Sequence, residues 1–165
     1  MTRLILICGL PGAGKSTLAR RIVAGRPAVR LCPDEWMEDL RIDLFDEDTR
    51  DRLERRFWVH AQELLRLGQT VVLESGFWVR AERDEKRLAA RALGTGVELH
   101  YLTAPVDELA RRIAARAAAG EPGAVPISRE LLDTYVPLFE APTAEELALF
   151  DQPAEVNRAA GSPDR

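Results

Sequence analysis

The 165-residue sequence has little lysine, cysteine and asparagine. Lysine occurs only at Lys15 and Lys86, so arginine carries nearly all of the positive charge. The two cysteines, Cys8 and Cys32, lie far apart in apolar, strand-like segments, which predicts buried thiols rather than a disulfide or a metal pair. The net charge of −4 excludes a global basic field for nucleic acid, so a nucleic-acid partner is not expected, although a small local site stays open.

Long hydrophobic runs are also absent, and no segment approaches the length that crosses a bilayer. The sequence enters its first strand candidate directly, without a signal-peptide pattern. We therefore expect no membrane partner and a reducing, cytoplasmic setting. The length and the ordinary composition, 46% hydrophobic and 30% charged, predict one domain with a substantial core. The oligomeric state stays open.

Because lysine is rare, the position of Lys15 is informative. The stretch Gly9-Leu10-Pro11-Gly12-Ala13-Gly14-Lys15-Ser16-Thr17 fits the phosphate-binding pattern G-x-x-x-x-G-K-[ST]. An apolar run precedes it and a helical pattern over 16–25 follows it. Glycines let the backbone N–H groups point inward, the lysine reaches the outer phosphates, and the hydroxyl of Ser16 can ligate Mg²⁺. The residues expected to bind the nucleotide are Gly12, Ala13, Gly14, Lys15, Ser16 and Thr17.

Strand and helix patterns alternate along the chain. Apolar runs at 4–8, 29–32, 70–74 and 97–102 predict strands, and helical patterns lie between and after them. This alternation predicts an α/β fold with a parallel sheet covered on both faces. Glu98 and His100 alternate with apolar residues, which predicts a wetter face or a place near the sheet edge. The domain is expected to span 1–151, followed by a weakly ordered tail over 152–165.

Two carboxylates follow strand candidates at the edge where ligands bind in such sheets. Asp34 comes after Cys32 and Pro33, where a carboxylate can take the proton of an attacking hydroxyl. The alternative is a helix N-cap, and Glu35 is the rival base. Glu74 ends an apolar run and is a candidate for holding Mg²⁺ opposite Ser16, with another polar role as the alternative.

Arginines and aromatic residues complete the candidate site. Arg112 and Arg116 lie four residues apart on one helix face, before a glycine-containing break, and can close over a triphosphate as a lid of about 112–128. A solvated arginine face is the alternative. Trp78, Arg80 and Arg83 follow Glu74 and would suit a polar or anionic ring-containing acceptor, although surface charge and core packing are the alternatives. Trp36 is expected mainly to pack, with pocket lining possible. His60 and His100 are expected to be structural.

The chain resembles the family of small AAA-type P-loop kinases, in a group with zeta toxins, polynucleotide 5′-kinases and chloramphenicol phosphotransferase. The resemblance covers Leu4 to about Asp151. It rests on GLPGAGKST, PDEW at 33–36, VVLESGFWVRAERD at 71–84, ELHYL at 98–102, the helix segment ELARRIAAR and FEAPTAEEL at 139–147.

The resemblance implies a three-layer α/β/α P-loop NTPase fold with a helical lid and a sheet of four or five strands in the order 2-3-1-4-5. It also implies ATP with Mg²⁺, Asp34 as the base and lid arginines at Arg112 and Arg116. The sequence departs from the family by having Glu74 where aspartate is usual, and by a faint fifth strand near Ala154–Val156.

These features predict a kinase that moves the γ-phosphoryl group of ATP to a hydroxyl of a small molecule such as an antibiotic, a nucleoside or a sugar-nucleotide. A nucleic-acid end kinase and a zeta-type toxin kinase are the alternatives within the class. A regulatory ATPase is the alternative from another class. A GTPase is disfavoured because the only asparagine is Asn157, which cannot form a guanine-reading N-K-x-D motif.

Overall fold

The computed structural model describes residues 1–151 of the chain. In this part, strands and helices alternate as the hydrophobic pattern predicts. The strands are β1 (Arg3–Cys8), β2 (Val29–Leu31), β3 (Val71–Gly76) and β4 (Gly96–Tyr101). The helices are α1 (Lys15–Gly25), α2 (Pro33–Asp39), α3 (Glu47–Arg66), α4 (Arg80–Ala92), α5 (Val106–Ala118), α6 (Arg129–Tyr135) and α7 (Ala144–Leu147), with a 3₁₀ turn at Val136–Leu138.

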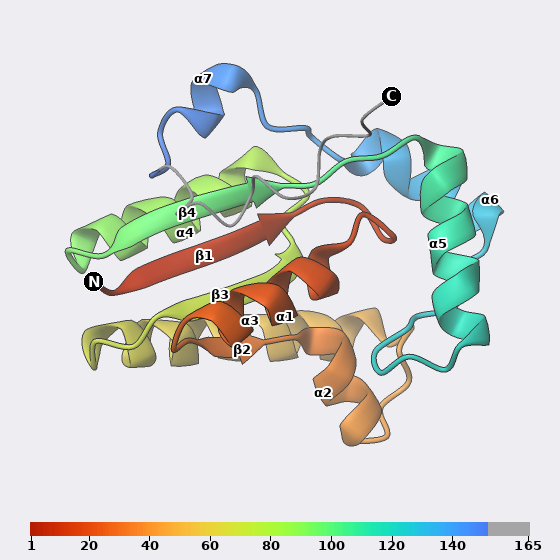
Figure 1. Ribbon diagram of the computed structural model, residues 1–165, viewed down its shortest axis with the longest axis horizontal. Helices are drawn as coiled ribbons and strands as arrows, with labels where there is room; N and C mark the ends of the chain where they lie inside the picture. Colours follow the sequence, from red (N-terminus) through yellow and green to blue (C-terminus); the bar gives the residue numbers. More distant parts are fainter. Residues whose placement is uncertain (152–165) are drawn as a thin grey trace.

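The strands form a parallel sheet in the order β2-β3-β1-β4 (Figure 1). Ile5 at the centre of β1 lies opposite Val72 of β3 and Glu98 of β4. The predicted α/β class and the strand order are confirmed over these four strands. Because all strands run the same way, their carboxyl ends meet at one edge, where the loops of the candidate site begin.

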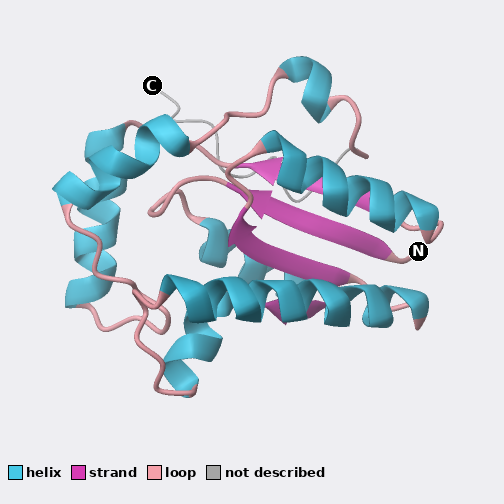
Figure 2. Cartoon of the chain, turned by 180° about the vertical axis from the view of Figure 1, so that it is seen from behind, coloured by secondary structure: helices cyan, strands magenta, loops and turns pink. Residues whose placement is uncertain are grey.

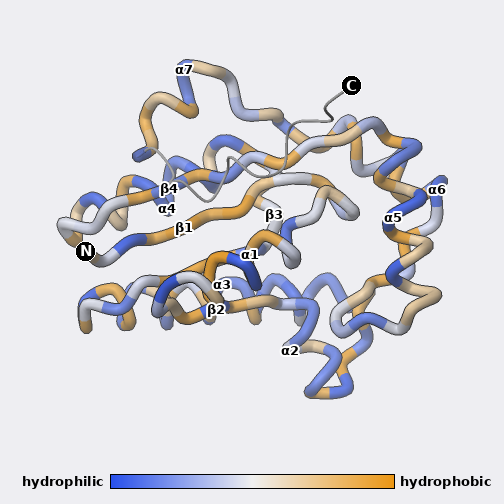
Figure 3. The backbone as a smooth tube through the Cα atoms, viewed as in Figure 1, coloured by the Kyte–Doolittle hydropathy of each residue, from blue (hydrophilic) through white to orange (hydrophobic). Residues whose placement is uncertain are grey.

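Helices cover both faces of the sheet, as Figure 2 shows for the face under α3 and α4. On that face, Leu4 and Leu6 of β1 pack with Phe57 and Ala61 of α3. On the opposite face, Ile5, Ile7 and Val72 pack with the apolar side of α1. Successive side chains of a strand point to opposite faces, so a continuous apolar run is what a sheet covered on both sides needs. Figure 3 shows the central strand β1 as a mostly hydrophobic segment.

Two polar residues of β4 are buried rather than wet. The Glu98 carboxylate has no exposed surface, and it accepts hydrogen bonds from the Arg26 guanidinium at 3.1 Å. The His100 ring lies 3.0 Å from the same carboxylate, and Arg3 adds an ion pair. Of the two interpretations of the alternation, the wetter face is wrong, because arginines near the sheet neutralise the buried charge. The place near the sheet edge is confirmed over residues 1–151, since β4 is the last strand in the order.

The long helix α3 begins at Glu47, two residues before Thr49, where the apolar pattern over 49–67 predicts its start. Its N-cap is Asp46, whose side chain accepts a hydrogen bond from the N–H of Thr49. The first turn contains acidic residues, whose negative charges are stabilised by the positive end of the helix dipole. Apolar periodicity does not detect a polar first turn, and the helix start was therefore placed too late.

Asp151 makes a single parallel bridge to Glu98, and its N–H donates to the Val97 carbonyl at 2.7 Å. The fifth strand expected near Ala154–Val156 and the tail over 152–165 lie outside the described residues. Cys8 and Cys32 are buried free thiols, as predicted, and burial raises the pKa of Cys8 to about 11. None of the helices found over residues 1–151 is long and apolar enough to cross a membrane.

Candidate active site

The phosphate-binding motif forms the loop between β1 and α1. Gly12 and Gly14 both have positive φ, at 80° and 98°. At Gly12 a side chain is excluded, because a Cβ atom there would lie 2.6 Å from the Leu109 carbonyl oxygen of α5. Helix α1 begins directly after Gly14 and has no side-chain cap. The N–H groups of its first turn are therefore available to an anion, supported by the helix dipole.

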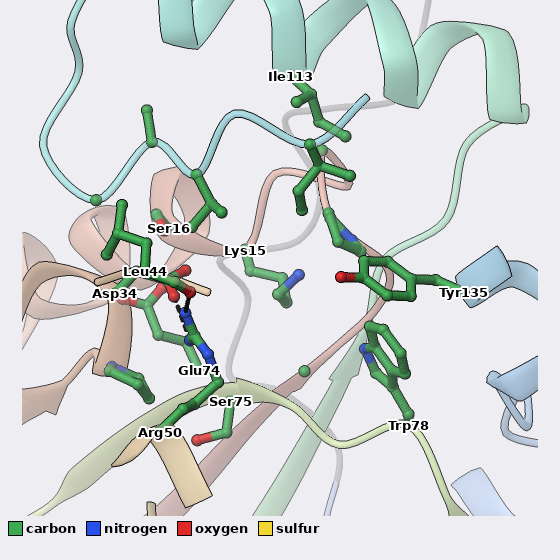
Figure 4. A pocket seen from close by; sticks show the side chains of 18 of the residues that line it. Lys15, Ser16, Asp34, Leu44, Arg50, Glu74, Ser75, Trp78, Ile113 and Tyr135 are labelled. Carbon is green, nitrogen blue, oxygen red and sulfur yellow. Dashed lines mark hydrogen bonds and ion pairs between the residues drawn. The ribbon is translucent and has the colours of Figure 1, made fainter. Parts of the chain in front are cut away.

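The side chain of Lys15 folds back over this loop. Its Nζ donates hydrogen bonds to the carbonyl oxygens of Gly9 and Leu10, both at 2.9 Å. Burial lowers the pKa of the ammonium group, and the charges of Asp34 and Glu74 act in the opposite direction. In Figure 4 the amine lies in the middle of the cavity, between Glu74 and Tyr135.

A cavity of about 520 Å³ opens in front of the loop. The phosphate loop forms one side of it, and α2, α3 and the end of β3 form another. Ile113 and Arg116 of α5, the segment 123–127 and Tyr135 of α6 close the third side. The cavity thus lies at the carboxyl edge of the sheet, where the topology predicts a ligand site.

Asp34 lines the cavity, but it is the second residue of α2 and not its N-cap. Cys32 caps the helix and Pro33 is its first residue, so the proposed capping role is wrong. The Asp34 carboxylate instead forms an ion pair with Arg50 of α3, drawn as a dashed line in Figure 4. Arg50 also donates to the Leu44 carbonyl oxygen at 2.9 Å.

The rival carboxylate, Glu35, does not line the cavity. Its oxygens accept hydrogen bonds from Arg30, at 2.7 and 2.9 Å, and from Arg20. The Arg30 guanidinium therefore holds the pKa of the Glu35 carboxyl below its ordinary value, against the effect of burial. Both oxygens are engaged, which leaves Glu35 poorly suited to accept a proton.

Glu74 and Ser16 line the same cavity. The Glu74 side chain is 1% exposed and forms an ion pair with Arg30, yet among the described residues neither of its oxygens accepts a hydrogen bond. A hydroxyl and a carboxylate with unused acceptor capacity are hard oxygen donors of the kind that Mg²⁺ uses together with phosphate oxygens and water. Within residues 1–151, no cluster of three or more acidic, histidine or cysteine side chains forms a metal site of its own. The residues fit a metal that arrives with the nucleotide.

The two predicted lid arginines differ in position. Arg116 lines the cavity, and its Nε donates to Glu121 at 2.8 Å. Arg112 lies outside the lining and pairs with Glu108 on the exposed side of α5, at 2.7 Å. The segment after α5 reaches across to α2, where the Gly123 N–H donates to Glu38 at 2.6 Å. The structure thus places only one of the pair at the cavity.

The predicted acceptor residues also separate. Trp78 lines the cavity and packs against Tyr135, with ring centroids 5.0 Å apart. Arg80 is exposed and pairs with Asp84 on α4, outside the cavity. Trp36 lies outside it too, packed edge-on against Phe57. The side chain of an arginine in the first turn of a helix can point toward the cavity or toward solvent. The local sequence pattern does not determine which of the two it does.

Arg83 is a core residue rather than an acceptor ligand. It has no exposed surface and makes a two-pronged ion pair with Glu146 of α7, at 2.6 and 2.9 Å. Its Nη1 donates to the Phe77 carbonyl oxygen at 2.9 Å. The expectation that Arg83 meets the acceptor is therefore wrong, because its guanidinium is buried between Glu146 of α7 and the Phe77 carbonyl.

In the phosphate motif itself, Gly12, Gly14, Lys15 and Ser16 line the cavity. Ala13 is buried and Thr17 is exposed, and neither side chain belongs to the lining.

Several cavity residues were missed by the sequence analysis. They are Arg50 and Tyr135 together with four carboxylates, Glu47, Asp51, Glu54 and Glu82. Residues 47, 50, 51 and 54 share one face of α3. The sequence there, DEDTRDRLERR, is dense in charge of both signs, so nothing local marks which members face a ligand. Only the packing of α3 beside α2 selects them.

Comparison with known proteins agrees with this geometry. A family model described as an AAA domain matches residues 4–142. No curated protein sequence matches the chain significantly. Among solved structures, a candidate kinase from Chloroflexus aurantiacus has a TM-score of 0.69 at 22% identity, over 86% of this chain and 82% of that one.

Two further structures show the range of the likeness. A chain of the Pnkp1/Rnl/Hen1 RNA repair complex has a TM-score of 0.69 at 19% identity, over 83% of this chain but only 43% of its own length. The APS kinase CysC from Mycobacterium tuberculosis, solved with AMPPNP and APS, has a TM-score of 0.54 at 26% identity, over 73% and 75% of the two chains. With the phosphate loop, the sheet order and the family match in agreement, the chain belongs to the AAA domain family, as a small P-loop kinase-type protein.

Proposed function

We propose that the chain is an ATP-dependent phosphotransferase that moves the γ-phosphoryl group to a hydroxyl of a small molecule, with Asp34 as the general base. The observation that carries the proposal is that Lys15 and Asp34 line one cavity, on different elements. The loop and α1 supply the anion site, and α2 supplies a carboxylate for the acceptor. The APS kinase similarity, with AMPPNP in that structure, supports nucleotide binding at such a loop.

In the proposed reaction, the loop N–H groups and Lys15 hold the outer phosphates. The acceptor hydroxyl gives its proton to Asp34 as its oxygen bonds to the γ-phosphorus, and the bond from that phosphorus to the bridging oxygen breaks to release ADP. Arg50 engages Oδ1 of Asp34, and within residues 1–151 nothing donates to Oδ2. That second oxygen is therefore available to the acceptor hydroxyl.

Charge at the transferring group is balanced by residues of this chain on two sides. Lys15 comes from the loop side and Arg116 from α5. Ser16, with Glu74 directly or through water, would hold Mg²⁺, which neutralises phosphate charge when it is bound. Arg112 stands outside this arrangement, unless α5 moves toward the cavity on nucleotide binding.

The test is an ADP-release assay with a library of hydroxylated metabolites and antibiotics, including an oligonucleotide with a free 5′-hydroxyl. Asp34→Asn should lower kcat about 10²- to 10⁴-fold and leave the Kd of ATP unchanged. Asp39→Asn is the matched control, because Asp39 is exposed at the other end of α2. Lys15→Ala should abolish turnover with every acceptor.

Loss of ATP binding in Asp34→Asn would contradict the assignment of a base. A library in which no compound raises turnover above the basal rate would contradict the phosphotransferase proposal as a whole.

A further inference from the structure

The cavity lining includes four carboxylates from α3 and α4, besides Asp34 and Glu74. Glu47, Asp51 and Glu54 project from one face of α3, and Glu82 projects from the start of α4. In the part of the chain that the structure describes, none of these four side chains has an ion pair or a hydrogen bond. The Glu146 carboxylate, by contrast, is paired with Arg83.

The cations that line the cavity are already engaged. Lys15 donates to two loop carbonyls, Arg50 pairs with Asp34, and Arg116 donates to Glu121. Lys15 and Arg116 are assigned to the phosphates, and Arg50 binds the proposed base, Asp34. None of them makes an ion pair with the four carboxylates of α3 and α4, so the acceptor end keeps a surplus of negative charge.

The carboxylates also act on one another. Burial raises the pKa of Glu54 to about 7, and the negative charges of Glu82 and Asp51 act in the same direction, against Arg50. Burial likewise raises the pKa of Glu82, with Lys86 opposing. A cation placed between α3 and α4 would relieve this repulsion, because it favours the charged form of each group.

An aromatic wall stands in the same cavity. The rings of Trp78 and Tyr135 meet at an angle of 56°, and Figure 4 shows both directed toward the cavity that holds Lys15. Leu44 and Leu138 add apolar surface. Aromatic faces attract cations and pack against apolar rings, so this wall suits the body of an acceptor whose charged group is positive.

We propose that the phosphate acceptor is a cationic alcohol. Its hydroxyl meets Asp34, its ammonium group lies among the carboxylates of α3 and α4, and its apolar or ring portion packs on Trp78 and Tyr135. The proposal rests on the proposed function and names its acceptor class. It replaces the anionic option in the expectation of a polar or anionic ring-containing acceptor, because the arginines on which that option depended, Arg80 and Arg83, lie outside the cavity.

The test uses two isosteric acceptor series that differ only in charge. One is phenylethanolamine, phenylethylene glycol and mandelate, and the other is 6-amino-6-deoxyglucose, glucose and glucuronate, whose members differ only at C6. Phosphoryl transfer from ATP is measured by mass spectrometry, and binding is measured separately by ligand-observed NMR in the presence of ADP. The cationic member of each series should bind about tenfold or more tightly than its neutral partner at pH 8.

The preference should depend on the two carboxylates nearest the junction of α3 and α4. In Glu54→Gln/Glu82→Gln, binding of the cations should weaken about tenfold, while binding of the neutral compounds and of ATP stays unchanged. Glu63→Gln is the matched control, since Glu63 lies on α3 outside the cavity and pairs with His60.

The outcomes separate the two proposals. Equal or stronger binding of the neutral or anionic members, or no binding of the cations, would overturn the cationic acceptor. Phosphoryl transfer to the neutral or anionic members would at the same time support the phosphotransferase proposal. A cation preference that survives in the double variant would also overturn the assignment. Cation binding that depends on Glu54 and Glu82, without transfer to any compound, would support the charge selectivity and contradict the proposed function.

Discussion

Removing Glu146 should destabilise the fold strongly, because it would leave the Arg83 guanidinium charged, buried and short of a partner. Arg83 has no exposed surface and Glu146 is 1% exposed. The pair holds two hydrogen bonds, at 2.6 and 2.9 Å. Breaking a buried ion pair by deleting one member costs about 3–5 kcal/mol of unfolding free energy. In Glu146→Ala, the Phe77 carbonyl is the only hydrogen-bond partner left to Arg83 among those that the structure shows.

The assay is urea unfolding followed by circular dichroism. With a urea m-value of about 2 kcal/mol/M, a loss of about 4 kcal/mol lowers the midpoint by about 2 M. Glu145→Ala is the matched control, because Glu145 is the exposed neighbour on α7 and should cost about 0.5 kcal/mol or less. Replacing both members with apolar residues, Arg83→Met with Glu146→Leu, should restore most of the loss.

A loss of unfolding free energy under about 1 kcal/mol in Glu146→Ala would refute the reasoning, since leaving a buried charge without its partner costs more than that. Because Arg83 anchors α7 through Glu146 and binds the Phe77 carbonyl, the loop at Phe77 and Trp78 should lose support in the same variant.

Two further predictions follow from the cavity. Glu54 has its pKa raised from 4.5 to about 7, amid Arg50, Asp51, Asp34 and Glu82, so the unfolded chain loses this proton at lower pH than the folded one. The unfolding free energy should therefore fall by up to about 3 kcal/mol as the pH rises from about 4.5 to 7, relative to that of Glu54→Gln. Paired urea titrations measure this difference, and parallel pH curves for the two proteins would contradict the prediction. Arg116→Ala should lower kcat about tenfold or more while Arg112→Ala lowers it at most about twofold, measured by ADP release, and equal losses would show that both arginines reach the phosphates.

The phosphate loop was predictable from sequence because its chemistry is local. The motif fixes its own backbone through Gly12 and Gly14, and the apolar run before it and the helical pattern after it place it at the end of β1. The sheet order over four strands was predicted through the family resemblance and is confirmed. Asp34 was located at the cavity because it lies just after the end of β2, at the carboxyl edge of the sheet.

Side-chain direction on helices was not predictable. Arg80 and Arg83 follow β3 in the same segment as Trp78, yet only Trp78 faces the cavity, because α4 turns one arginine to solvent and the other into the core. Arg83 has its partner 63 residues away on α7, and no local pattern encodes that pairing. The same holds for Glu98, which looked solvent-facing by alternation and is neutralised by Arg26 from the end of α1.

The sequence by itself therefore determined the phosphate-binding loop of this protein. A few adjacent residues set the backbone conformation of the loop, and the strand order places it at the edge of the sheet. The tertiary structure decided the rest of the cavity, where side chains from α2, α3, α4, α5 and α6 meet. Arg50 became the partner of Asp34, Tyr135 the partner of Trp78, and the acidic face of α3 part of the cavity only through packing between distant segments. Charge in such a pocket depends on which groups find partners, and that is a property of the folded chain alone.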